Sequence, residues 1–141
     1  MSADAAMTRR QLLVAALLPF ASSFGVPNGL VGATSVVQWV RGRLFPNVRA
    51  AVTVGDLYLQ KQPEEGSTAW LAYELFGNDA FRDVDRDGDE RLRKRLRTSR
   101  DLDFRNDDLV VLNGWVVART EARLLGLLSL STRATKNADR L

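Results

Sequence analysis

The acidic stretch at residues 83–89 is the segment whose residue types and spacing come nearest to a metal site. It reads Asp-Val-Asp-Arg-Asp-Gly-Asp, and an EF-hand calcium loop begins with the same Asp-x-Asp-x-Asp-Gly spacing. Such a loop needs an aliphatic residue at its eighth position and a bidentate Glu at its twelfth, whereas this chain has Glu90 and Lys94 there. The basic residues from Arg91 to Arg100 would also repel a bound cation. We therefore expect no metal site.

The same stretch fits the start of a solvated helix, with acidic residues first and basic residues later, as the helix dipole favours. Ion pairs four residues apart, Asp87 with Arg91 and Glu90 with Lys94, would support such a helix. The basic run 91–97 contains no aromatic residue, which argues against a nucleic-acid surface. Contact with an acidic partner or with anionic lipid headgroups stays open, and so does peripheral association with a membrane.

Four carboxylates near the carboxy terminus could in principle serve as acid and base: Asp103, Asp107, Asp108 and Glu121. Paired carboxylates do this only when burial separates their pKa values, and Asp107-Asp108 lies beside an expected turn, in water. The chain has no Cys and no His. Thiolate nucleophiles, disulfides, Cys/His zinc sites, iron–sulfur clusters and Ser-His relays are therefore excluded. We expect a protein that is not an enzyme and binds no cofactor of its own.

The composition suits one globular domain, since 45% of the 141 residues are hydrophobic and 26% are charged. The net charge is +3, but 20 basic and 17 acidic residues are interspersed along the chain. Such a balance gives little support for nucleic-acid binding, and we expect none.

The helices expected to position these side chains follow from apolar residues at helical spacing. They lie at 35–44, at 48–61 and from Pro63 to Gly77, and Pro46-Asn47 separates the first two. The resulting fold class is mainly α, a small helical domain with a short β-ribbon before its last helix.

The ribbon is predicted from two β-branched runs, Leu109–Leu112 and Trp115–Val117, which flank Asn113-Gly114. An Asn-Gly pair in this setting is a strong signal for a hairpin with a type I′ turn. The alternative is that 109–117 forms one extended segment. The last helix is expected to start near Arg119, and its nearly continuous Leu residues suggest either buried core or a surface that a partner covers.

The amino terminus reads Thr8-Arg9-Arg10-Gln11-Leu12-Leu13 and continues as an apolar run to Ala21. A paired arginine before a moderately apolar run, too short to span a bilayer, is typical of a leader read by the twin-arginine translocase. The usual pattern has Phe at the position of Leu12 and Lys at that of Val14. We therefore predict a periplasmic protein whose export signal includes Arg9 and Arg10.

Small residues that suit cleavage occur at Val31-Gly32-Ala33 and at Ala21-Ser22-Ser23. We predict a signal peptide at 1–33 and a small helical domain at 34–141. The alternative is an uncleaved, membrane-associated amphipathic start. The twin-arginine route carries folded cargo that has first acquired a cofactor or a partner, and a chain without cofactor ligands favours the partner.

The string 113–124, with Asp103-Phe104 upstream, resembles a motif of small twin-arginine-exported proteins. Some of these are similar to the small subunits that accompany periplasmic flavin-dependent alcohol or sugar dehydrogenases. The family pattern has Ser where this chain has Ala118, so half of a capping box with Glu121 is missing. The resemblance implies a helper that carries the export signal for a larger flavoprotein.

Two functions follow as hypotheses. The first is an exported, non-catalytic accessory subunit that carries or stabilises a larger periplasmic oxidoreductase, with a partner-binding set of Trp115, Arg119, Glu121 and Arg123. The second is a free-standing periplasmic binding or scaffolding domain, with an aromatic pocket of Trp70, Tyr73, Phe76 and Trp115. An ordinary structural role is the alternative for the partner-binding set: Trp115 in the core, Glu121 as a cap, and the arginines in water or paired with Asp107 and Asp108.

Overall fold

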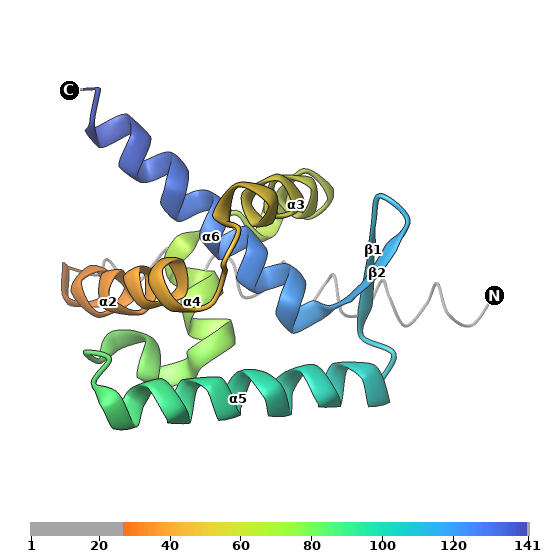
Figure 1. Ribbon diagram of the computed structural model, residues 1–141, viewed down its shortest axis with the longest axis horizontal. Coiled ribbons are helices and arrows are strands. Elements are labelled where there is room, and N and C mark those ends of the chain that lie inside the picture. The colour runs from red at the N-terminus through yellow and green to blue at the C-terminus, as the bar shows by residue number, and fades with distance from the viewer. Residues whose placement is uncertain (1–26, 141) are drawn as a thin grey trace.

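The computed structural model describes residues 27–140, and side chains from residue 35 onward. This part of the chain is mainly helical, with five α-helices and one two-stranded antiparallel hairpin before the last helix (Figure 1). The elements in chain order are α2 (Pro27–Arg43), α3 (Val48–Lys61), α4 (Thr68–Phe76), α5 (Arg86–Arg105), β1 (Leu109–Leu112), β2 (Trp115–Ala118) and α6 (Arg119–Ala138). The predicted fold class is confirmed.

Helix α6 lies at the centre of the bundle and contacts α2, α3, α4 and α5, while α5 runs along one side of the molecule (Figure 1). The core is built from residues of every helix and of β1. Its largest fully buried apolar and aromatic side chains are Tyr58, Phe76, Leu71, Leu92, Leu127, Leu128, Val36 and Val40. The apolar stripe of the last helix is thus partly core, in agreement with one of its two interpretations.

Helices α3 and α6 approach closely where glycines meet. A Cβ atom on Gly55 would lie 2.1 Å from the carbonyl oxygen of Leu125, and one on Gly126 would lie 3.0 Å from Cδ1 of Tyr58. A side chain on Gly55 would collide with the backbone of α6, whereas one on Gly126 would require only a small shift of the Tyr58 ring, so Gly55 above all fixes how closely α6 crosses α3.

The helix boundaries agree with the expected ones in one case and differ in two. Helix α3 runs over 48–61 as predicted, because Asn47 Oδ1 accepts a hydrogen bond of 3.1 Å from the Ala50 amide. Helix α2 begins at Pro27, before the predicted start at residue 35.

The helix predicted from Pro63 to Gly77 is wrong in its first part. A 3₁₀ turn occupies Pro63–Glu65, and α4 begins separately after Ser67. Ser67 Oγ accepts a hydrogen bond of 3.3 Å from the Trp70 amide, so this residue acts as a new N-cap. The break has a structural consequence, because it turns Glu65 into the core, where its side chain is only 3% exposed.

The hairpin is present and the extended alternative is wrong. Leu112 pairs with Trp115, and Val111 pairs with Val116. Asn113 and Gly114 both have positive φ, at 51° and 86°, as a two-residue type I′ turn requires.

Helix α6 starts at Arg119, as expected, but its cap comes from another helix. Ala118 offers no side-chain cap, and Asp103 Oδ2 on α5 accepts a hydrogen bond of 2.6 Å from the Thr120 amide. The half of the capping box that the sequence lacks is therefore replaced over a long range. Within the described residues, no helix is long and apolar enough to cross a membrane.

Candidate functional site

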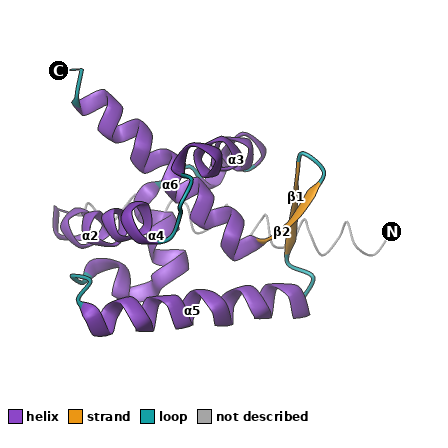
Figure 2. Ribbon diagram, in the orientation of Figure 1, coloured by secondary structure: helices purple, strands orange, loops and turns teal. Residues whose placement is uncertain are grey.

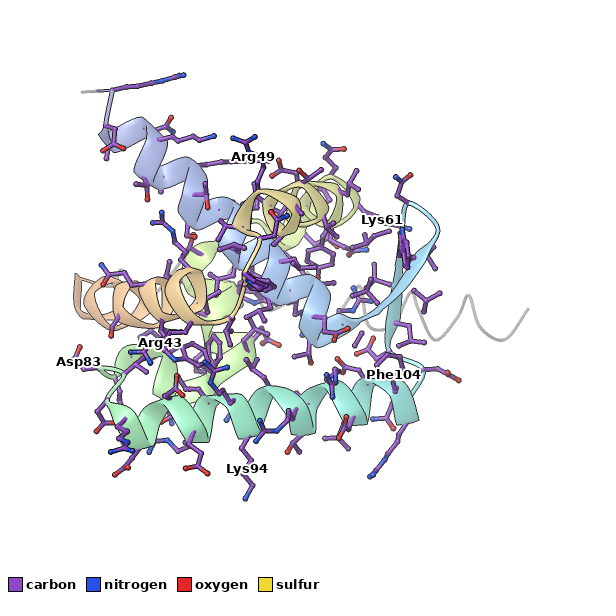
Figure 3. All side chains as sticks on the ribbon, viewed as in Figure 1. Arg43, Arg49, Lys61, Asp83, Lys94 and Phe104 are labelled. Atoms are coloured by element: carbon purple, nitrogen blue, oxygen red, sulfur yellow. The ribbon has the colours of Figure 1, made fainter. Side chains whose placement is uncertain are left out.

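The hairpin lies at one end of the molecule (Figure 2). It holds large apolar side chains in solvent. Trp115 is 77% exposed, Val116 57% and Val111 49%. We call these three residues the hairpin surface. Phe104, near the end of α5, is also exposed and lies beside the base of the hairpin (Figure 3). The exposure of Trp115 shows that its alternative assignment to the core is wrong.

The hairpin is anchored by its other side chains. Val110 and Leu112 of β1 are buried, and Val117 of β2 packs against the core. From the end of α3, Lys61 Nζ donates a hydrogen bond of 2.7 Å to the Val111 carbonyl (Figure 3). The hairpin surface is therefore presented on a fixed support.

Arg123 lies inside the molecule, where it forms a bidentate pair with the buried carboxylate of Glu65. The Nε and Nη2 atoms lie 3.1 Å from the two oxygens of Glu65, and Nη1 lies 3.3 Å from Glu74 Oε2. The guanidinium also stacks 5.1 Å from the centre of the Trp70 ring. The Tyr58 hydroxyl donates to Glu65 Oε2 as well. We call Tyr58, Glu65 and Arg123 the buried ion cluster.

The environment of the cluster shifts two pKa values. Burial raises the pKa of the Tyr58 phenol well above its usual value, and the neighbouring negative charge of Glu65 adds to the effect. Burial lowers the pKa of the Arg123 guanidinium, but the hydrogen bonds and charge of Glu65 outweigh it, so the pKa lies above its usual value. Both groups therefore keep their neutral-pH states, a protonated phenol and a charged guanidinium.

Arg119 and Glu121 lie in the first turn of α6, directly after the hairpin. Arg119 Nε is 3.4 Å from Asp108 Oδ1, which is the pairing that the structural alternative expected. Burial lowers the pKa of Arg119, but Tyr58 and the carboxylates of Asp108 and Glu65 raise it by more, so the pKa lies above its usual value. Glu121 Oε1 lies 3.9 Å from Arg100 Nη1, and both side chains are about two-fifths exposed, at 41% and 43%. Of the four predicted contact residues, Trp115 and Glu121 thus face solvent, whereas Arg119 and Arg123 have internal partners.

An open apolar groove of about 330 Å³ lies between α5 and α6, next to the hairpin. The side chains that line it are Leu44, Phe45, Leu96, Val117, Glu121, Leu124 and Leu125. Glu121 is its single charged lining residue, so the groove suits an apolar group.

The predicted aromatic pocket is not formed. Trp70 and Phe76 are buried in the core, whereas Tyr73 is half exposed on α4 and stacks 6.1 Å from Phe81. Trp115 lies on the hairpin, and none of the four aromatic residues lines the groove.

The acidic stretch serves the start of α5. Asp85 Oδ1 accepts a hydrogen bond of 2.6 Å from the Gly88 amide and caps the helix. Asp89 accepts from Trp39 Nε1 and lies 3.0 Å from Arg93 Nε, and these two hydrogen bonds lower its pKa. Arg91 pairs with Asp79 at 3.5 Å, not with Asp87 as expected. Among the described residues, no group of three potential ligands is arranged to hold a metal ion.

Asp103 and Asp108, which were also considered as acid or base, have structural partners too. Asp103 caps α6 and Asp108 pairs with Arg119, while Asp107 is exposed in the turn before β1 with a positive φ of 53°. They do not converge on a shared cavity. Arg9 and Arg10 of the predicted export signal lie outside the described residues.

Comparison of the chain with protein-family models, with curated proteins and with solved structures found no match.

The sequence patterns did not predict three features of this site: the exposed Val111, the exposed Val116 and the groove. The valines could have been found, because a two-residue turn fixes the register and so pairs Val111 with Val116 on one face. The groove could not, because its lining comes from the turn after α2 and from α5, β2 and α6, and carries no local signal.

Proposed function

We propose that the chain is an exported, non-catalytic accessory subunit that binds a larger periplasmic oxidoreductase and carries or stabilises it. The observation that supports this most is the hairpin surface, where Trp115 is 77% exposed on a fixed support. Large aromatic residues are enriched at the centres of protein interfaces and are costly to expose otherwise.

The neighbouring residues divide into contact and support. The Glu121 side chain is 41% exposed and lines the groove, so it can reach a partner, and we retain it with Trp115 as a contact residue. Arg119 and Arg123 act from inside, because their ion pairs hold the first turns of α6 against the core. We assign them to positioning of the contact surface.

The partner and the route come from the amino-terminal pattern and the family resemblance. Arg9 and Arg10 would direct the complex to the twin-arginine translocase, and a larger flavoprotein without its own leader would cross with it. The flavin and the redox chemistry would belong to that larger subunit, and this chain would bind none.

The test is a tagged pull-down from the periplasm of the native host, with mass spectrometry and a flavin absorbance scan. Wild type should co-purify with one large flavoprotein, and Trp115→Ala should lose it. Tyr73→Ala is the matched control, since Tyr73 is an exposed aromatic residue of α4, away from the hairpin.

A second comparison tests the export role. Arg9→Lys with Arg10→Lys should remove both the chain and the flavoprotein from the periplasm. A lone chain in the wild-type periplasm, or equal loss of the partner in both aromatic variants, would refute the proposal.

The groove favours a second candidate function, a periplasmic domain that binds a small apolar ligand. Its volume of about 330 Å³ lies at the lower end of the range of small-molecule sites. Titration of the purified chain with medium-chain alkyl ligands should then raise its melting temperature, and Leu124→Asp should abolish the shift. An unchanged melting temperature with every chain length would exclude this function.

A further inference from the structure

We propose that the free edge of β2 pairs with β2 of a second copy, so that two hairpins form one four-stranded antiparallel sheet. The inference does not rest on the proposed function, because it requires only this chain.

The backbone geometry of the hairpin makes one edge available. In a two-residue hairpin the residues that flank the turn, Leu112 and Trp115, form a hydrogen-bonded pair. Because hydrogen-bonded and non-hydrogen-bonded pairs alternate along an antiparallel ladder, the next pair, Val111 and Val116, is a non-hydrogen-bonded pair. The amide and carbonyl groups of Val111 and Val116 therefore point away from the hairpin, on opposite edges. The hydrogen bond from Lys61 Nζ to the Val111 carbonyl confirms this on the β1 side.

The two edges differ in how they are covered. Lys61 occupies the β1 edge, whereas among the described residues no group bonds the Val116 backbone from outside the hairpin. Natural proteins protect free edges with charged residues or Pro, and residues 109–118 contain neither. The outward amide and carbonyl of Val116 are thus available for pairing.

The sequence of β2 is complementary to itself. Antiparallel pairing about a two-fold axis at Val116 places Val116 opposite Val116 of the second copy, and Trp115 opposite the second copy's Val117. Aromatic and β-branched side chains are a favourable cross-strand pair, and no charges meet across the axis. The pairing joins the two exposed Val111 and Val116 rows into one apolar face. A dimer therefore enlarges the exposed face that carries Val111 and Val116.

The test uses cysteine cross-linking of the full chain, which has no native Cys to give a background. In the proposed pairing the two Val116 Cα atoms lie about 5.5 Å apart, within the range of a disulfide. The two Val111 Cα atoms lie about 14 Å apart, so they cannot be bridged. Under mild oxidation Val116→Cys should form a covalent dimer and Val111→Cys should stay monomeric, although the two positions are similarly exposed.

Sedimentation of the unmodified chain gives an independent measurement. Wild type should sediment at twice its mass of 15.7 kDa at high concentration. Val116→Pro removes the outward amide without removing a hairpin hydrogen bond and should give a monomer, while Val111→Pro, the matched change on the covered edge, should remain a dimer. Circular dichroism checks that both variants are folded.

Two results would overturn the inference. One is a wild-type chain that stays monomeric at every concentration, which would show that the β2 edge does not pair with a second copy. The other is equal cross-linking at the two cysteine positions, which would indicate random collision.

Discussion

Glu65 and Arg123 form an ion pair in the interior of the domain, where water could not take the place of either group as a partner for the other. The Glu65 side chain is 3% exposed and that of Arg123 is 18% exposed. Removing Glu65 takes away the bidentate partner of Arg123 and leaves only the partly exposed Glu74 beside the guanidinium, and the loss of a partner from a buried ion pair is costly. We expect Glu65→Ala to lower the free energy of unfolding by about 3–5 kcal/mol, measured by urea denaturation.

The matched control is Glu74→Ala, which removes the other carboxylate that Arg123 contacts. The Glu74 side chain is 29% exposed, so water can replace it, and the loss should stay within about 1 kcal/mol. Equal losses in the two variants would show that the bidentate geometry around Glu65 has no special weight.

Because of the Tyr58 phenol, the free energy of unfolding should fall as the pH rises in the alkaline range. Its pKa is about 10 in the unfolded chain and is raised in the folded protein by burial and by Glu65. The unfolded state therefore loses its proton first, so the stabilisation is present below about pH 10 and is lost as the pH rises above that value. Denaturation midpoints should fall more steeply above about pH 10 in wild type than in Tyr58→Phe, which differs from it only by the phenol hydroxyl. Parallel pH profiles would contradict this.

Sequence patterns could not have found the buried ion cluster. Glu65 and Arg123 are 58 positions apart, and an acidic residue after Pro63 looks like part of a solvated first turn. Arg123 was expected at a partner surface for the same reason, since local spacing shows a residue's helix face but not which neighbouring element covers it. The alternative prediction that Arg119 pairs with Asp108 is correct, because the two residues are only 11 positions apart.

At the level of elements, the contact between α3 and α6 depends on two glycines. Gly55→Ala forces its methyl group against the carbonyl of Leu125, a backbone atom that cannot move without shifting α6. We expect a loss of at least about 3 kcal/mol in the free energy of unfolding. Gly126→Ala meets side chains only, the edge of the Tyr58 ring at 3.0 Å and Leu59 Cδ2 at 3.4 Å, and should cost about 1 kcal/mol.

Gly42→Ala is the control for these two substitutions. Gly42 lies in the last turn of α2, and a Cβ atom added there would meet no other atom within 4 Å, so Ala should stabilise the helix by up to about 1 kcal/mol. Thermal and urea unfolding should rank Gly42→Ala above wild type, then Gly126→Ala, then Gly55→Ala. Any other order would argue against a glycine-determined crossing.

Local signals predicted those elements whose boundaries are set by neighbouring residues. Asn113-Gly114 alone specifies the hairpin turn, and Asn47 with Pro63 bounds α3. The sequence around Gly66-Ser67 contained the signal for the break before α4, but Pro63 appeared to be a sufficient helix start. The cap of α6 by Asp103 carries no local signal, since the two positions meet only after the hairpin has turned the chain back.

At the scale of the whole molecule, the residues that support the fold are separate from those of the contact surface. The ion cluster and the two glycines hold α6 in the centre of the bundle, and the hairpin extends from its first residue (Figure 1). Changes in the interior should therefore act on binding only through stability. Changes on the hairpin surface should act on binding directly.

The tryptophans allow this separation to be tested. Trp70 is 5% exposed and packs against Arg123, so Trp70→Ala should cost about 3–5 kcal/mol of unfolding free energy. Trp115→Ala should leave stability within about 0.5 kcal/mol, because its side chain is 77% exposed. If Trp115 anchors the interface, the same variant should weaken partner binding about 30-fold or more, measured by titration calorimetry with the co-purified partner. A Trp115→Ala chain that loses stability and keeps full affinity would reverse the assignment, because Trp115 would then support the fold and the contact surface would lie elsewhere.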